Sequence, residues 1–74
     1  MENAIRELGY ELIRSSDWWW RFMANGHECF IHETQWGRFG SQIYTLKVDG
    51  KTIMAGGKIN TCFAKIRKLT GGAQ

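Results

Sequence analysis

The sequence predicts an α+β fold: an antiparallel β-meander of four or five strands, with a short N-terminal helix and a C-terminal amphipathic helix packed on the sheet. Two Asx-Gly pairs, at 25–26 and 49–50, each lie between runs rich in aromatic and β-branched residues, which is a strong signal for a β-hairpin. A helical apolar periodicity follows in residues 59–69. The 74 residues are expected to form a single small domain, 1–74, in which 70–74 is a loose tail.

The N-terminal segment is expected to form a short helix and then a short strand. Residues 2–8 (ENAIREL) place Ala4, Ile5 and Leu8 on one helical face and stop at Gly9, a residue type that commonly ends helices. Residues 10–14 (YELIR) read as a strand that is closed by the turn-forming sequence Ser-Ser-Asp. The sheet has five strands if this segment joins it and four if it does not.

The first hairpin determines where three consecutive tryptophans point. A two-residue turn at Asn25-Gly26 sets the strand pairing and sends alternate side chains to opposite faces. The predicted pairs are Trp18 with Glu33, Trp20 with Ile31, Phe22 with Cys29, Arg21 with Phe30, and Trp19 with His32. The face that carries Trp18, Trp20 and Phe22 is the more apolar and is expected to pack on the core. Trp19 therefore lies on the other side of the sheet.

The second hairpin follows from the same rules. The segments IYTLKV and KTIMA flank Asp49-Gly50, and Gly56-Gly57 is expected to end the second strand. The turn predicts that Leu46 pairs with Ile53, Tyr44 with Ala55, Thr45 with Met54, and Lys47 with Thr52.

The last segment, residues 58–69, is predicted to be an amphipathic helix that ends at Gly71. Its apolar stripe consists of Ile59, Cys62, Phe63, Ile66 and Leu69. A second stripe beside it carries Lys58, Lys65 and Lys68. Lysines and free N–H groups at a helix start that follows two glycines are a reasonable phosphate-docking feature.

Charge is distributed unevenly along the chain, whose net charge is +3. Residues 1–46 carry a net charge of −2, and residues 47–74 carry +5. A basic C-terminal third favours an anionic partner. The alternative is a solvated lysine-rich surface, which many small soluble domains have.

Several functional classes are disfavoured. The chain has no nucleophile paired with a base at a recognisable spacing and no glycine-rich phosphate loop after a strand, so we expect neither an enzyme nor a cofactor. His27, Cys29 and His32 carry zinc-binding atoms, but strand alternation points His32 away from the other two, so no metal site is predicted. No apolar run has membrane-spanning length, and residues 1–8 have neither an apolar core nor a basic lead, so we expect neither a membrane anchor nor a secretory signal unless processing removed one.

The two cysteines indicate a cytoplasmic protein. Cys29 is expected in the sheet and Cys62 on the helix packed over it. Such layers lie about 10 Å apart, which is too far for a disulfide. Two reduced, buried thiols are typical of a reducing compartment.

The candidate binding residues fall into three groups. The first, called the outer face below, interleaves rings and cations on one side of the sheet: Trp19, Arg21, Phe30, His32, Thr45 and Lys47. The second is the loop between the hairpins, with Trp36, Arg38 and Phe39, and the third is the lysine stripe Lys58, Lys65 and Lys68. Aromatic side chains stack on nucleic-acid bases and cations neutralise phosphates, so these groups predict a nucleic-acid-binding module.

The element order and the lysine-bearing last helix resemble those of double-stranded-RNA-binding modules and of small three-stranded integrase arm domains. The resemblance covers the element order and one helix. It implies that the start of the helix contacts nucleic acid, where the lysine cluster of such modules is reduced here to Lys58.

Two other uses of the outer face stay open. Tryptophan and arginine also dominate protein–protein hot spots, so the chain is alternatively a small phage-type inhibitor or adaptor (anti-defence or host-takeover) that binds a host protein through exposed aromatics. In the third interpretation, the N-terminal helix covers this face and its residues belong to the core. Exposed edge strands further favour a homodimer.

Overall fold

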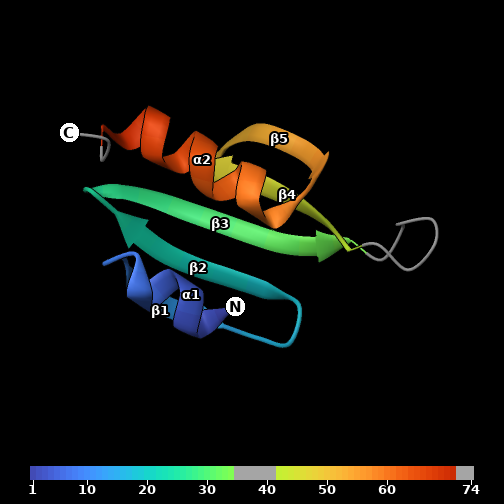
Figure 1. The fold of residues 1–74 in the computed structure, drawn as a ribbon, viewed down its shortest axis with the longest axis horizontal. Helices are drawn as coiled ribbons and strands as arrows, with labels where there is room; N and C mark the ends of the chain where they lie inside the picture. Colours follow the sequence, from blue (N-terminus) through green and yellow to red (C-terminus); the bar gives the residue numbers. More distant parts are fainter. Residues whose placement is uncertain (35–41, 72–74) are drawn as a thin grey trace.

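The computed structural model describes residues 1–34 and 42–71 and confirms the α+β fold (Figure 1). Five antiparallel strands form one meander in the order β1-β2-β3-β4-β5. The strand predicted at residues 10–14 is observed at 11–15 and joins the sheet, so the five-stranded alternative is the one observed. The elements are α1 (Glu2–Glu7), β1 (Glu11–Ser15), β2 (Trp19–Ala24), β3 (His27–Thr34), β4 (Ile43–Val48), β5 (Lys51–Gly57) and α2 (Ile59–Thr70).

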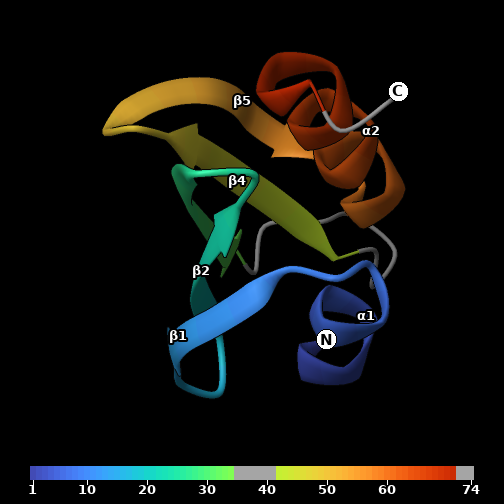
Figure 2. The same ribbon diagram turned by 90° about the vertical axis from the view of Figure 1, so that its left-hand side faces the viewer.

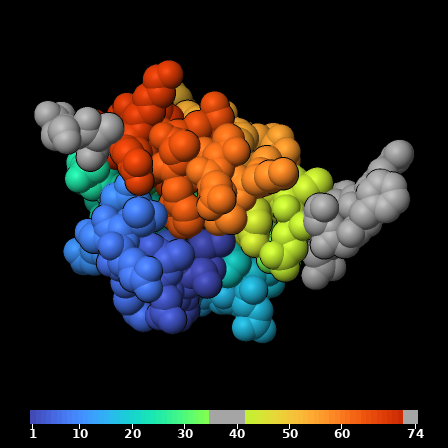
Figure 3. All heavy atoms as spheres, in the orientation of Figure 1, coloured from blue at the N-terminus to red at the C-terminus, as the bar shows by residue number. Residues whose placement is uncertain are grey.

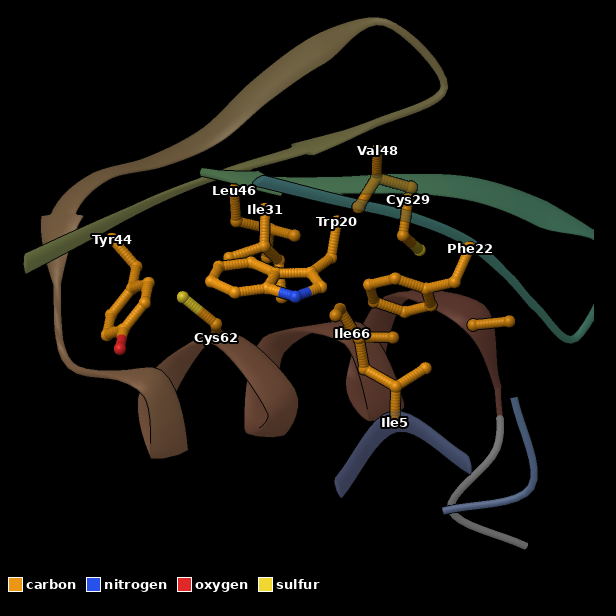
Figure 4. Packing of buried hydrophobic residues seen from close by; sticks show 11 residues of the cluster. Ile5, Trp20, Phe22, Cys29, Ile31, Tyr44, Leu46, Val48, Cys62 and Ile66 are labelled. Atoms are coloured by element: carbon orange, nitrogen blue, oxygen red, sulfur yellow. The ribbon is translucent and has the colours of Figure 1, made fainter. Parts of the chain in front are cut away.

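Both helices pack on the same side of the sheet (Figure 2). Figure 3 shows this helix-covered side, where the atoms of α2 lie above those of α1. Ile5 of α1 and Cys62 and Ile66 of α2 are completely buried against the strands. The buried core consists of these three with Trp20, Phe22, Ala24, Cys29, Ile31, Tyr44, Leu46 and Val48 (Figure 4). The helix side of the sheet is called the inner face below.

The register of the first hairpin is the predicted one. Asn25 and Gly26 both have positive φ, 52° and 85°, as a type I′ turn requires. Trp20 pairs with Ile31, and Arg21 pairs with Phe30. Trp20 is only 7% exposed, and Figure 4 shows its indole ring in the layer between the sheet and α2.

The prediction that Trp18 lies in the core is wrong, because this side chain is 53% exposed. β2 begins one residue later, at Trp19. Trp18 belongs to a bend in which its own N–H donates to Ser16 Oγ (3.4 Å) and the Ser16 N–H donates to the Trp19 carbonyl (2.9 Å). Glu33 still donates its N–H to the Trp18 carbonyl (2.7 Å). The backbone neighbour is thus the expected one, but strand alternation no longer directs the indole.

The second hairpin departs from the predicted register at two bulges in β5. Lys47 pairs with Thr52 as expected, whereas Leu46 pairs with Met54 rather than with Ile53. Beyond the second irregularity, Tyr44 pairs with Gly57 rather than with Ala55. Each bulge places two residues of β5 against one of β4, and an extra residue of this kind strengthens the local twist.

Glycine permits the second bulge. Gly56 has φ = 79°, a conformation that residues with a Cβ seldom adopt. A Cβ on Gly57 would collide with the side chain of Met54. The two glycines therefore form the last two residues of β5, so the strand ends at Gly57 rather than before the glycine pair.

The last helix is observed one residue later than the predicted 58–69: Lys58 is its N-cap, and Gly71 (φ = 74°), the predicted stop, is its C-cap. Leu69 is 50% exposed, so its predicted place in the core is wrong. Thr70, predicted to be loose, is buried instead: its hydroxyl donates to the Ile66 carbonyl (2.8 Å) and accepts from Asn25 Nδ2 (3.0 Å). The first hairpin turn thereby holds the end of α2. Residues 72–74 lie outside the described residues.

Both cysteines are free thiols, as predicted, and both are buried. Burial is the main cause that raises the pKa of Cys29 and that of Cys62 to about 11. Thiols of this kind are protonated at neutral pH and pack as small apolar side chains. Neither described helix has the length and apolar character needed to cross a bilayer.

Candidate functional site

The outer face is built from alternate residues of three neighbouring strands. Phe30 of β3 pairs with Arg21 of β2 on one side and with Lys47 of β4 on the other. The next row along the strands is formed by Trp19, His32 and Thr45. The three interior strands thus bring all six predicted outer-face residues together.

The N-terminal helix does not cover this face. Ile5 packs into the core on the inner face, and no helix among residues 1–34 and 42–71 lies on the opposite side of the sheet (Figure 2). Arg21 and Lys47 are exposed, while Trp19, Phe30 and His32 are half-buried. Half-buried rings of this kind are held by their neighbours and still present surface to a ligand.

The row Arg21-Phe30-Lys47 lines a pocket of about 240 Å³, together with Glu28 and Gly50. The Arg21 guanidinium carbon lies 5.9 Å from the centre of the Phe30 ring, within reach of a cation–π interaction. Two cations therefore flank one aromatic ring. This arrangement can accept a planar group against the ring and an anionic group at its side.

Aromatic rings continue from this pocket along the strands. Trp19 stacks on Phe30, with ring centroids 5.7 Å apart and planes 25° from parallel. The ring centroids of Phe30 and His32 lie 5.8 Å apart. The rings of Trp18 and His32 make a T-shaped contact, with centroids 6.4 Å apart and planes at 87°. These four residues form what we call the aromatic run. Trp18 was not predicted to join it, because that prediction assumed that β2 begins before this residue.

Glu28 is a pocket residue that sequence reasoning left out of the site. Its Oε2 lies 3.8 Å from Arg21 Nε, and the two side chains are 54% and 48% exposed. Exposed ion pairs of this kind contribute about 1 kcal/mol or less to stability, so this pair does not hold Arg21 firmly. The register did contain the signal, because it pairs Glu28 with Met23 on the outer side of the sheet.

A clamp between two turns holds the backbone of Glu28. Asp49, in the turn between β4 and β5, accepts the Glu28 N–H on Oδ1 (3.2 Å), and its own N–H donates to the Glu28 carbonyl (2.8 Å). Asp49 Oδ2 lies 2.7 Å from His27 Nδ1. The hydrogen bond with His27 is the main cause that lowers the pKa of Asp49 below its ordinary value. The clamp fixes the end of the pocket that Glu28 and Gly50 form.

The lysine stripe is not brought together with the outer face. Lys58, Lys65 and Lys68 are exposed. Lys58 is the N-cap of α2 and the other two lie on this helix, which packs on the inner face (Figure 2). A ligand seated among Arg21, Phe30 and Lys47 is separated from this stripe by the sheet. The structure therefore divides the predicted basic residues into two sets.

The remaining predicted residues are those of the loop between the hairpins and those that carry zinc-binding atoms. Trp36, Arg38 and Phe39 lie outside the described residues. Within the part of the chain that the structure describes, no group of three or more histidine, cysteine or acidic side chains is placed to hold a metal ion. Cys29 points into the core, whereas the ring of His32 joins the aromatic run.

Comparison of the chain with protein-family models, with curated proteins and with solved structures finds no match.

Proposed function

We propose that this chain is a non-catalytic binding module for single-stranded nucleic acid and that its outer face is the binding surface. The observation that carries the proposal is the pocket in which Arg21 and Lys47 flank the ring of Phe30, next to Trp19. Stacking on aromatic rings contributes about 1–3 kcal/mol per base, and cations beside the rings neutralise the phosphates between bases.

The aromatic run favours unpaired bases over a duplex. The faces of a base within a duplex are occupied by its neighbours, so side-chain rings reach bases mainly in single strands, loops and bulges. Trp19 stacks on Phe30, and the ring of His32 is tilted by 48° against that of Phe30. The three rings thus form contiguous aromatic surface on the sheet for successive bases to contact. A duplex-binding mode through α2 would instead use the lysine stripe on the other side of the sheet.

Two double variants with the same change in charge test the proposal. Arg21→Gln with Lys47→Gln removes two positive charges from the outer face, and Lys65→Gln with Lys68→Gln removes two from α2. We expect the first to weaken binding of a labelled single-stranded oligonucleotide about tenfold or more, since each lost contact is a hydrogen bond to a charged group. The second should change affinity about twofold or less. Fluorescence anisotropy at several salt concentrations measures both.

The salt dependence supplies an independent reading of the same experiment. Each phosphate contact with a single strand contributes about −0.7 to the slope of log affinity against log salt. The outer-face variant should therefore have a slope about 1.4 shallower than the wild type. Equal losses in both variants would show that affinity follows total charge, and the outer face would then not be the binding surface.

The alternative proposal is a protein partner, as in a small phage-type inhibitor or adaptor. It is favoured by Trp18, whose exposed indole lies at the end of the aromatic run. A hydrophobic interface predicts affinity that is nearly independent of salt, which distinguishes it from the first proposal. A homodimer formed through the edge strands β1 or β5 and a cytoplasmic location both stay predictions, and the mass of the protein in solution tests the first of these.

A further inference from the structure

We infer that the outer-face pocket selects guanine among the four bases and that Glu28 is the residue that selects it. This inference rests on the proposed function. The ring of Phe30 stacks on any base, and Arg21 and Lys47, which carry only donors, are assigned to the phosphates. Glu28 is the lining side chain that offers acceptors and no donor, so it is the one that recognises donors on the edge of a base.

Both carboxylate oxygens of Glu28 are available to a ligand. Among residues 1–34 and 42–71, its nearest cation is Arg21 Nε at 3.8 Å, which is longer than a hydrogen bond. The side chain is 54% exposed and lines the pocket beside Phe30. The Asp49 clamp holds its backbone at both the N–H and the carbonyl. The carboxylate is thus attached to a fixed point at the pocket wall, and among the described residues its one ion pair, with Arg21, is longer than a hydrogen bond.

Guanine matches two adjacent acceptors. Its Watson–Crick edge presents the N1–H and the exocyclic N2–H₂ side by side, and unpaired bases are read on that edge. Adenine and cytosine each present one amino group next to an acceptor nitrogen that a carboxylate repels. Thymine and uracil present one N–H between two carbonyl oxygens. A bidentate contact between one side chain and one base discriminates by about 5- to 150-fold.

The pocket size fits a base that belongs to a polymer. Its volume of about 240 Å³ is below the range of about 300–1,000 Å³ that encloses small-molecule ligands. A pocket of this size holds one planar group against Phe30 and leaves the sugar and phosphates outside. Arg21 and Lys47 then meet the phosphates on either side of the bound base.

The negative charge of Glu28 has a second effect on binding. It repels phosphates, so it lowers the affinity of every oligonucleotide whose base does not compensate by donating to it. Glu28→Gln should therefore act in opposite directions on different ligands. Binding of a guanine ligand weakens because a bidentate acceptor is lost, whereas binding of the other ligands strengthens because a like charge is removed.

The experiment uses pentanucleotides whose central base is guanine, adenine, cytosine or the base of the flanking positions. The flanking bases are thymine in the deoxyribo form and uracil in the ribo form. Competition anisotropy measures the affinities. We expect the wild type to bind the central-guanine ligand at least about fivefold more tightly than the other three. In Glu28→Gln the four affinities should converge to within about twofold. The control is Glu7→Gln, which removes the same charge from an exposed position on α1 and should keep the preference.

The outcomes separate the inference from the proposed function. If the wild type binds all four ligands equally, the selectivity for guanine is wrong and the binding surface stands. If guanine is preferred but Glu28→Gln retains the preference, another residue reads the base and the role of Glu28 is wrong. If neither form of any ligand binds at low salt, the proposed function itself fails. Denaturation midpoints of the variants verify that each is folded.

Discussion

Two neighbouring tryptophans show how differently the two faces of this sheet are used. Trp20 is 7% exposed and packs in the core beneath α2, whereas Trp19 lies on the outer face and stacks on Phe30. One step along a strand separates them, and the pleat of the strand is the cause. The same type of side chain therefore contributes to stability on one face and is available for binding on the other.

The contrast extends to polar groups. In the described residues the strands place apolar side chains toward the helices, and both cations of the pocket, Arg21 and Lys47, point away from them. Both helices cover one face, so the small core is concentrated in a single layer. The outer face is left with half-buried rings that no helix among the described residues covers, so part of their surface stays accessible to a stacking ligand.

The largest expected effect comes from replacing one phenylalanine on each face by alanine. Phe22 is fully buried on the inner face, and Phe22→Ala should lower the free energy of unfolding by about 3–5 kcal/mol. Phe30→Ala, on the outer face, should cost much less stability but abolish detectable stacking of a base. Urea denaturation, followed by tryptophan fluorescence, measures the first quantity, and anisotropy measures the second.

Phe22→Leu keeps the comparison measurable if Phe22→Ala does not fold. It retains part of the buried volume, so the folded state should persist with a lower urea midpoint and with unchanged oligonucleotide affinity. A Phe30→Ala variant as unstable as Phe22→Ala would show that the outer face belongs to the core, and the division between the faces would be wrong.

The second effect concerns the aromatic run. Trp19→Ala removes one stacking ring, so the affinity for a single-stranded oligonucleotide should fall by about 1–3 kcal/mol, or about 5- to 150-fold. Trp18→Ala removes the ring at the end of the run and should have the smaller effect of the two. If Trp18→Ala weakens binding more than Trp19→Ala does, the ligand contacts the bend before β2 rather than the sheet surface.

Local signals in the sequence predicted the first hairpin well. Asn25-Gly26 selects a two-residue turn, and this turn alone determines every pair between β2 and β3. The same reasoning failed in β5, because the bulges depend on Gly56 and on the packing of Met54 rather than on the turn. Trp18 was misplaced for a related reason: where a strand begins depends on the hydrogen bonds of the preceding bend.

The pocket was predicted only in part. Arg21, Phe30 and Lys47 follow from strand alternation, which the two hairpin turns specify. The register of the first hairpin also places Glu28 on this side, whereas Gly50 joins the pocket because the β4–β5 turn meets the start of β3, and that meeting depends on the pairing of β3 with β4. A pairing between hairpins leaves no short-range signal in a sequence, so the Asp49 clamp was not predicted.

The smallest expected effect is the acid sensitivity of this clamp. The pKa of Asp49 is lower in the folded protein than its ordinary value of about 3.9. A carboxylate with a lowered pKa contributes stability that is fully present above its unfolded-state pKa and is lost as the pH falls through its folded-state pKa. Asp49→Asn keeps a residue that tolerates the positive φ of 53° at this position, but it removes the charge.

The wild type should therefore be more stable than Asp49→Asn at pH 6, and the difference should shrink as the pH is lowered from about 4 towards 2. The other carboxylates titrate in both proteins, so the difference between the two unfolding free energies isolates Asp49. Urea midpoints at a series of pH values measure it. A difference that stays constant over this range would mean that His27 and the Glu28 N–H are held equally well by the neutral group, and the clamp would then be independent of charge.

Because the clamp positions Glu28 rather than the core, oligonucleotide selectivity at pH 6 should also decrease in Asp49→Asn, whereas the packing around Trp20 should not change.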